Sequence, residues 1–508
     1  MIDDCLLTVR NGQAVARSEV PTLPVEEFRR AVIETVSTGK TIAALFGDAS
    51  SEGAVDFYVV LADNRRAELL VSRARLEGDS FPSLTPDCPQ AHLFEREIAE
   101  QFGVRIEGHP WLKPVRFHSS YRPGRDTRAR SKKKPAAVGV IDFYRVDGDE
   151  IHEVGVGPVH AGIIEPGHFR FQCHGEQVLH LEISLGYQHR GIERALAGGP
   201  TKRTISMLEA VAGDTSIGHA TAYCQAVEAL ADCQVPIRAD VLRGVTLELE
   251  RLANHTGDLG ALAGDVGFLP TASFCGRVRG DFLNLTALIC GSRFGRGMVR
   301  PGGVAFDVDE RRRSQCLERL DQALRDVTVA VELLWNSATV QARFEGAGRI
   351  SRDDCLALGM VGPAARACGV PVDVRNDFPA GIFRFVQAPI STLPTGDVFA
   401  RAYLRWLEIE RSALLIREQL QALPEGPTRA APAAMGAGKL VVSLVEAWRG
   451  QLCHVALTDG HGRFARYKVV DPSFHNWAGL AMALRDQQIS DFPLFNKSFN
   501  LSYCGHDL

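Results

Sequence analysis

Twelve cysteines are the residues of this chain whose spacing most directly tests for metal or redox chemistry. Paired thiolates two residues apart hold zinc, iron–sulfur clusters and other soft metals, and cysteines can also pair as disulfides. No two of the twelve are separated by only two residues, and none has zinc-finger spacing with histidine. Most lie in apolar or helical sequence, so we expect reduced, buried thiols in a reducing cytoplasm. They are Cys5, Cys88, Cys173, Cys224, Cys233, Cys275, Cys290, Cys316, Cys355, Cys368, Cys453 and Cys504.

The bulk composition is that of a folded protein with two or three domains. The chain has 508 residues, 45% hydrophobic and 23% charged, and a net charge of -4. So small a charge gives no general attraction to nucleic acid or anionic lipid. The first ten residues lack a signal-peptide core, and no stretch approaches the roughly 18 to 20 apolar residues of a membrane span. We therefore expect any membrane contact to be made through partner subunits.

The first part of the chain, residues 1–118, is predicted to be a mixed α and β domain. Val55–Leu61 is rich in β-branched and aromatic residues and predicts a buried strand. Pro86–Phe102 predicts a helix, with proline near its start and Gly103 just past its end. Residues 119–137 are basic, lack apolar periodicity and predict an exposed linker. The alternative for this linker is a surface that touches acidic partners or lipid headgroups.

The rest of the chain, residues 138–508, is predicted to be mainly helical. It opens with strand-like sequence at 138–146 and 168–183. Apolar residues then recur at three- and four-residue steps in 241–252, 317–334 and 402–420, which indicates long amphipathic helices packed as a bundle. A loop is predicted at 428–438, followed by a strand at 440–448. The fold class is therefore α+β, an α+β domain followed by a helical bundle with small sheets.

Two windows of sequence resemble known families. FPSLTPDCPQAHLFEREIAEQFGVRIEGHPW, residues 81–111, resembles the 30 kDa subunit of respiratory complex I. The chain after the linker resembles the 49 kDa subunit of complex I and the large subunit of energy-converting, group 4 [NiFe]-hydrogenases. Matching segments are GPVHAGIIEPGHFRF (157–171), LGYQHRGIE (185–193), HATAYCQAVE (219–228), LELERLANHTGDLG (247–260), RPGG (300–303), RFEGAGRISRDDCLALGMVGPAARACG (343–369), PTGDVFARA (394–402) and VEAWRG (445–450). Fusion of the two subunits in one chain is the arrangement of formate-hydrogenlyase-like and hydrogenase-4-like enzymes.

The resemblance implies a nickel–iron site that this sequence does not supply. In the hydrogenases, two Cys-x-x-Cys pairs hold the metals through thiolates, which few other side chains can replace. The positions that match the first pair are Ala212 and Thr215, and those that match the second are Ser502 and Gly505. Cys504 is adjacent but out of register by one residue. We therefore expect no metal and no bound cofactor in this chain.

Residues around the lost site carry the remaining chemistry that the resemblance implies. Glu165 matches the proton-relay glutamate and Arg449 the arginine above the metals, so the two are candidates for proton transfer, with a structural ion pair as the alternative. His168 matches the histidine that contacts the quinone headgroup in complex I, and it could donate a proton to a reduced carbonyl oxygen. The tyrosine of that quinone site falls on Gly213, next to Asp214, so the quinone site is incomplete.

The expected function is that of an oxidoreductase subunit, related to NADH-quinone oxidoreductase and active only within a complex on the cytoplasmic face of the membrane. The resemblance implies a small subunit with a [4Fe-4S] cluster docked near Glu165, His168 and Gly213. It also implies a ferredoxin-like subunit and membrane antiporter-like and anchor subunits. Electron transfer, with quinone as a possible acceptor, would then drive ion translocation. The alternatives are a catalytically silent scaffold and an active [NiFe]-hydrogenase. A nicotinamide would have to bind a partner, because no Gly-x-Gly-x-x-Gly follows a strand here.

Overall fold

The computed structural model describes residues 5–49, 53–125, 138–160 and 164–508. The first domain is a mainly antiparallel sheet in the order β1-β6-β5-β4, with β3 added parallel to β6. A small parallel pair, β7 with β8, lies beside it. The elements are β1 (Leu7–Val9), β3 (Thr22–Leu23), α1 (Val25–Ser37), β4 (Thr41–Ala49), β5 (Val55–Asp63), β6 (Glu68–Leu76), β7 (Ser80–Pro82), η3 (Pro89–Ala91), α2 (His92–Phe102) and β8 (Arg105–Glu107).

The two elements predicted for this domain are present. Every residue of β5 is buried, since this strand lies between β4 and β6 in the interior of the sheet. Helix α2 ends where predicted, because Gly103 adopts a left-handed conformation with φ of 64° and caps it. It begins later than predicted, at His92, because the residues from Pro86 form turns and then the 3-10 helix η3.

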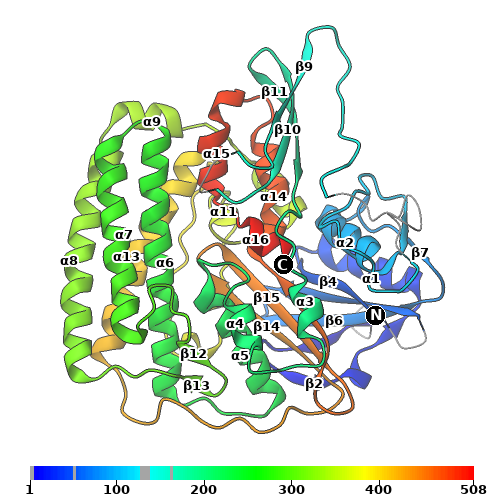
Figure 1. Ribbon diagram of the computed structural model, residues 1–508, viewed down its shortest axis with the longest axis horizontal. Coiled ribbons are helices and arrows are strands. Elements are labelled where there is room, and N and C mark those ends of the chain that lie inside the picture. The colour runs from blue at the N-terminus through cyan, green and yellow to red at the C-terminus, as the bar shows by residue number, and fades with distance from the viewer. Residues whose placement is uncertain (1–4, 50–52, 126–137, 161–163) are drawn as a thin grey trace.

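Four long helices form the bundle of the second part (Figure 1). They are α6 (Ile237–Asp265), α7 (Leu269–Cys290), α8 (Glu310–Trp335) and α13 (Val398–Gln421). The apolar repeats predicted in 241–252, 317–334 and 402–420 lie in α6, α8 and α13, so these predictions are confirmed. Their apolar faces are buried against one another, which is what a 3.6-residue apolar period requires.

A four-stranded sheet joins the bundle to the first domain. Its order is β16-β15-β14-β2, so a strand near the N-terminus pairs with one more than 400 residues later. The strands are β2 (Ala14–Ala16), β14 (Lys439–Ala447), β15 (Gly450–Thr458) and β16 (Phe464–Val470). Side chains of β14 to β16 contribute to the core of the first domain, and Figure 1 shows these strands between that domain and the bundle. The loop predicted at 428–438 and the strand after it are confirmed.

A three-stranded antiparallel sheet, in the order β11-β10-β9, follows the linker. Its strands are β9 (Ile151–Val156), β10 (His168–His174) and β11 (Gln177–Ser184). The prediction of strand structure at 138–146 is wrong, because this segment has no neighbouring strand to pair with. Val138 and Val140 are 46% and 61% exposed, so the apolar residues there do not mark a buried face.

The predicted linker is only partly outside the domains. Arg122 and Arg125 form ion pairs with Asp79, and the backbone N–H of Tyr121 donates to the Gln101 carbonyl at 2.6 Å. Residues 119–125 are therefore docked on the first domain and do not form the free linker that their composition predicted. Residues 126–137 lie outside the described part of the chain.

The remaining elements of the described residues are shorter than the four bundle helices. They are η2 (Arg17–Glu19), α3 (Ile192–Leu196), α4 (Thr204–Leu208), α5 (Ser216–Leu230), β12 (Val299–Arg300), β13 (Gly303–Val304), α9 (Ala338–Phe344), α10 (Arg352–Leu358), α11 (Gly362–Arg366), α12 (Val374–Asp377), η4 (Gly381–Arg384), α14 (Pro472–Ala483), η5 (Ile489–Asp491), α15 (Phe492–Phe499) and α16 (Tyr503–Asp507). Among the helices of the described residues, none combines the length and apolar character that a membrane crossing needs.

Candidate functional site

A cavity of about 570 Å³ lies where the start of α5, the β14–β15 turn and the C-terminal segment meet. Three of the predicted site residues line it: Glu165, Asp214 and Arg449. Further polar residues around it come from α6, α7 and the C-terminal segment, and they are Asn254, Asp258, Arg279, Lys497, Asn500 and Tyr503. The structure thus brings together side chains that are up to 338 residues apart, between Glu165 and Tyr503.

The cavity is organised by a bidentate ion pair between Arg449 and Asp214. The two guanidinium nitrogens of Arg449 lie 2.6 and 2.8 Å from the two Asp214 carboxylate oxygens. Burial alone would lower the pKa of Arg449, but the Asp214 carboxylate raises it above its ordinary value. Burial likewise opposes ionisation of Asp214, but Arg449 lowers its pKa below the usual range. Both groups therefore remain charged at neutral pH, and the partner of Arg449 is Asp214 and not Glu165.

Hydrogen bonds tie this pair to Asn500, Thr215 and Trp448. Arg449 donates from Nε to the Asn500 carbonyl at 2.6 Å and from Nη1 to the Thr215 hydroxyl at 3.2 Å. The Asp214 carbonyl accepts from the Trp448 indole at 3.0 Å. The turn that carries Arg449 passes close to Gly362, where a Cβ would fall 2.2 Å from the Arg449 carbonyl oxygen. Only glycine, which here has a φ of 66°, allows that approach.

Glu165 reaches the same region from the segment before β10. Its Oε2 accepts hydrogen bonds from the backbone N–H groups of Tyr503 at 3.2 Å and Cys504 at 3.5 Å. Burial, together with the Glu165 carboxylate, raises the pKa of the Cys504 thiol to about 12. Cys504 is therefore a neutral thiol at physiological pH, which makes it a poor metal ligand as it stands.

The four positions that the resemblance predicts to correspond to metal ligands are Ala212, Thr215, Ser502 and Gly505, and their side chains carry no thiol. Ala212 is buried and has no donor atom, and the Thr215 hydroxyl is already bonded to Asp214, Arg449 and Trp448. The Ser502 hydroxyl accepts from the backbone N–H of Gly505 at 2.9 Å. A Cβ at Gly505 would fall 2.7 Å from the Asp471 carboxylate, so a larger residue there would need Asp471 to move. Within the described ranges, no three His, Cys, Asp or Glu residues gather closely enough to hold a metal ion.

The two predicted quinone contacts do not line this cavity. The His168 ring is engaged on both sides, with Nδ1 3.1 Å from the Gly157 carbonyl and Nε2 accepting from the Arg170 guanidinium at 3.2 Å. Nδ1 must carry the proton to donate to a carbonyl, so Nε2 has none to give. A Cβ at Gly213 would meet only Arg296, at 3.9 Å. The quinone contact expected at His168 stays a prediction, and His168 lies apart from the residues that line this cavity.

The histidines in the matched windows mostly have structural partners. His219 contacts Asp471 at 3.2 Å and His454 at 3.1 Å, and His255 contacts Glu408 at 2.8 Å. His219, His255 and His454 are fully buried, and burial lowers the pKa of His255 and His454. Both ring nitrogens of His219 and His454 have partners, whereas His255 is bonded through Nε2 only and its buried Nδ1 has no hydrogen-bond partner.

A network of buried ion pairs was not predicted from the sequence. Arg366 pairs with Glu408 at 2.8 Å and with Glu446 at 2.7 Å, and Arg375 pairs with Asp373 and Glu248. Arg251, on α6, donates to the carbonyls of residues 446 and 447, just before the Arg449 turn. The signal available in the sequence was the presence of charged residues inside otherwise apolar windows, such as LELERLANH.

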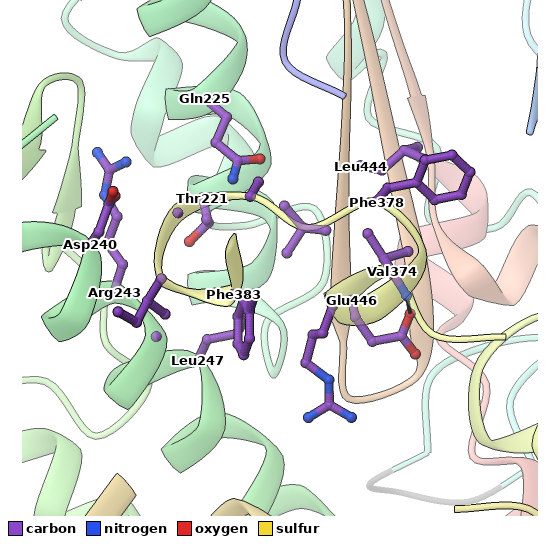
Figure 2. A pocket seen from close by; sticks show the side chains of 16 residues that line it. Thr221, Gln225, Asp240, Arg243, Leu247, Val374, Phe378, Phe383, Leu444 and Glu446 are labelled. Atoms are coloured by element: carbon purple, nitrogen blue, oxygen red, sulfur yellow. Dashed lines mark hydrogen bonds between the residues drawn. The ribbon is translucent and has the colours of Figure 1, made fainter. Parts of the chain in front are cut away.

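The same network borders a second, smaller cavity of about 40 Å³ (Figure 2). Figure 2 shows Thr221 and Gln225 on α5, Asp240 and Arg243 on α6, and Glu446 on β14 around it. Burial raises the pKa of Asp240 to about 6, and burial with the nearby Asp373 carboxylate raises that of Glu446 to about 7. The space suffices for a few water molecules.

Glu250 should make stability depend on pH. Its buried carboxylate accepts from the backbone N–H groups of Ile217 at 2.8 Å and Gly218 at 3.2 Å. Burial raises its pKa to about 8, against about 4.3 in an unfolded chain. The folded chain therefore holds a proton that the unfolded chain releases, and the free energy of unfolding should fall as pH rises from about 5 to 8.

We expect Glu250→Gln to reduce that fall by on the order of 1–3 kcal/mol, measured by urea unfolding at several pH values. Glu176→Gln, at an exposed glutamate, is the control and should leave the slope unchanged. An identical pH slope for wild type and Glu250→Gln would contradict the prediction.

The fold and the site together define a large subunit of the complex I and hydrogenase type, fused to a smaller domain. The family model of the 49 kDa subunit of respiratory-chain NADH dehydrogenase matches residues 265–439 and 433–507. The model of the 30 kDa subunit of the same enzyme matches residues 33–130. The chain belongs to the family of the 49 kDa subunit and the related hydrogenase large subunits, with a 30 kDa-type domain in front. It is an oxidoreductase subunit of that type.

Individual relatives agree with this assignment. The chain is 32% identical to a carbon monoxide-induced hydrogenase of Rhodospirillum rubrum, over 69% of this chain and 97% of the relative. It is 28% identical to hydrogenase-4 component G of Escherichia coli, over 88% and 80% of the two chains. Formate hydrogenlyase subunit 5 of Escherichia coli is also 28% identical, over 92% of this chain and 84% of the relative.

Proposed function

We propose that this chain is the large subunit of a membrane-associated oxidoreductase complex that couples electron transfer to ion translocation without a nickel–iron centre. The observation that carries the proposal is the Arg449–Asp214 ion pair. It joins the segment of Ala212 and Thr215 to the C-terminal segment of Ser502 and Gly505, where the hydrogenases bind metal through thiolates. In this chain the Arg449–Asp214 ion pair and the hydrogen-bonded hydroxyl groups of Thr215 and Ser502 occupy the region where the hydrogenases have four cysteine thiolates.

The partners follow from the same resemblance. The chain contains no cysteine set for a cluster of its own, so electrons must come from a neighbouring [4Fe-4S] subunit. Relatives named as a hydrogenase-4 component and a formate hydrogenlyase subunit support a multi-subunit assembly. The proposed set is a small iron–sulfur subunit, a ferredoxin-like subunit and membrane antiporter-like and anchor subunits, with this chain on the cytoplasmic face of the membrane.

The proposed chemistry of this chain concerns protons. Glu165 is half-buried, lines the cavity and forms no ion pair with Arg449. It is therefore the group proposed to take up and release protons in the cavity. The Arg449–Asp214 pair holds the cavity walls in place. The proposal of a quinone acceptor rests on the resemblance at His168 alone, and no step through a quinone is derived.

The first test is the nickel content of the intact complex isolated from native membranes, by elemental mass spectrometry. We expect less than about 0.1 nickel per chain, because no thiolate set is available. Close to one nickel per chain would overturn the proposal and indicate that the chain is the large subunit of an active hydrogenase.

A second candidate is a catalytically silent scaffold that transmits conformational change between subunits. It is favoured by the ion pair of Arg449 with Asp214 and by the hydrogen bond that His168 Nε2 accepts from Arg170, which leave neither side chain free to react. The scaffold predicts that Glu165→Gln, His168→Ala and Arg449→Lys leave electron transfer in the complex unchanged. The proton-transfer proposal predicts a loss of about tenfold or more for Glu165→Gln. Glu176→Gln and His461→Ala, at exposed positions, are matched controls.

A further inference from the structure

Three consecutive residues of helix α2 are charged, Glu95, Arg96 and Glu97, and of these three the two glutamates have clear structural roles. Glu95 accepts hydrogen bonds from the Leu84 backbone N–H at 2.6 Å and from the Ser83 hydroxyl at 2.7 Å, which fixes the loop after β7. Glu97 points to the joining sheet and binds Lys468. Arg96 projects between them, and its charge has no such partner.

The Arg96 guanidinium is held only by carbonyl oxygens. Its Nε donates to the Lys113 carbonyl at 2.8 Å and its Nη2 to the Pro114 carbonyl at 3.0 Å. Across the part of the chain that the structure describes, no carboxylate forms an ion pair with it. Glu182 is near but is taken by the Lys113 ammonium at 2.6 Å and by the Tyr144 N–H at 2.8 Å. Burial lowers the pKa of Arg96 to about 10, so it stays charged at a cost that a counter-ion would offset.

Arg96 opens into a cavity of about 180 Å³ between α2, β11 and α14. The walls include the aromatic rings of Trp111 and Trp477 and the aliphatic side chains of Leu181 and Leu185. Two residues of this lining each carry a buried nitrogen without a hydrogen-bond partner, His180 at Nε2 and Trp477 at Nε1. Trp477 is only 3% exposed, so an unpaired indole N–H there is costly unless a bound molecule satisfies it.

The Glu182 carboxylate on this lining and Glu100 favour the charged form of Arg96 without forming an ion pair with it, and the histidines on the lining add no charge. Burial lowers the pKa of His92 to about 3, and it also lowers the pKa of His180 and His506. These three rings are therefore neutral at physiological pH. The lining thus presents a guanidinium without an ion pair among the described residues, polar groups without hydrogen-bond partners and flat apolar walls.

We propose that this cavity binds a small organic monoanion, whose carboxylate pairs with Arg96 and whose flat apolar body lies against the tryptophan walls. A guanidinium prefers a carboxylate as a bidentate partner. A cavity of roughly 150 Å³ holds one benzene ring, so an aromatic monocarboxylate has a suitable size. The site is separate from the cavity of Glu165 and Arg449, and the proposal is independent of the function proposed above.

The test is equilibrium dialysis of radiolabelled benzoate with the full-length chain and with the isolated complex. We expect saturable binding to both, competed by unlabelled benzoate and at least about tenfold less well by neutral benzamide or by benzylamine. Arg96→Gln should weaken binding about tenfold or more, whereas Arg65→Gln, at an exposed arginine, should not change it.

A variant that leaves Arg96 intact protects the test against misfolding. Ala478 lines the cavity on α14, and Ala478→Leu should fill the space and abolish binding in a chain with unchanged circular dichroism. Equal affinity for benzoate and benzamide, undiminished binding by Ala478→Leu, or no saturable binding would overturn the proposal. Benzoate binding that is seen with the isolated chain but not with the complex would also overturn the proposal. That result would indicate that a carboxylate of a partner subunit occupies the cavity.

Discussion

Replacing Glu97 by glutamine is expected to lower the free energy of unfolding by about 3–5 kcal/mol. The Glu97 carboxylate is fully buried and lies 2.7 and 2.6 Å from the Lys468 ammonium on β16, and it also pairs with Arg116. Glutamine would leave these two cations with Glu193 as their remaining partner. Because Glu97 belongs to the first domain and Lys468 to the joining sheet, the loss should also loosen the contact between them. Urea unfolding of the purified chain measures the effect.

The same cluster should make the chain sensitive to acid. Burial alone would raise the pKa values of Glu97 and Glu193, but Lys468 and the arginines lower both below the usual range. Their stabilising contribution is therefore present above the unfolded value of about 4.3 and is lost as pH falls further. Glu97→Gln should weaken this acid dependence. The double variant Glu97→Gln/Lys468→Met should recover part of the stability, and a double variant no more stable than the single one would contradict the ion-pair explanation.

Replacing Asp214 by asparagine is expected to destabilise the chain by about 2–4 kcal/mol and to reduce the activity of the complex. The Arg449 side chain is 5% exposed, so loss of its carboxylate leaves a buried charge without a partner, while Asp214 at 32% is partly open to the cavity. The cavity walls at Thr215 and Asn500 are held through Arg449, so their geometry should relax as well. Thermal unfolding of the chain and electron transfer by the complex are the two measurements.

Comparison of two double variants separates charge from geometry at this pair. Asp214→Asn/Arg449→Met removes both charges and should recover most of the stability but none of the activity that depends on the pair. Swapping the charges, Asp214→Arg/Arg449→Asp, should recover little stability, because the backbone carbonyl of Asn500 and the hydroxyl of Thr215 are oriented toward a donor at position 449. If Asp214→Asn alone were as stable as the wild type, water would be solvating the Arg449 charge and the ion pair would not be needed for stability.

Local pattern in the sequence was sufficient to predict the main elements. The apolar period in 241–252, 317–334 and 402–420 required one buried helical face, and these segments form α6, α8 and α13. The β-branched run at Val55–Leu61 required a buried strand, and Gly103 required a helix end. The prediction of a strand at 138–146 was wrong. A strand needs the backbone N–H and C=O groups of a neighbouring strand as hydrogen-bond partners, and an alternating sequence does not show whether such a neighbour exists.

The sequence by itself therefore determined the α+β fold class, the family and the absence of thiol side chains at Ala212, Thr215, Ser502 and Gly505, since all of these follow from residue type and local spacing. Only the tertiary structure decided that Arg449 pairs with Asp214, 235 residues away, and that Glu97 pairs with Lys468, 371 residues away. It also decided that Arg96 has no carboxylate partner among the described residues. Charge pairing across such separations depends on how the domains pack, and ionic interactions act over a few ångströms in space, whatever the distance along the chain.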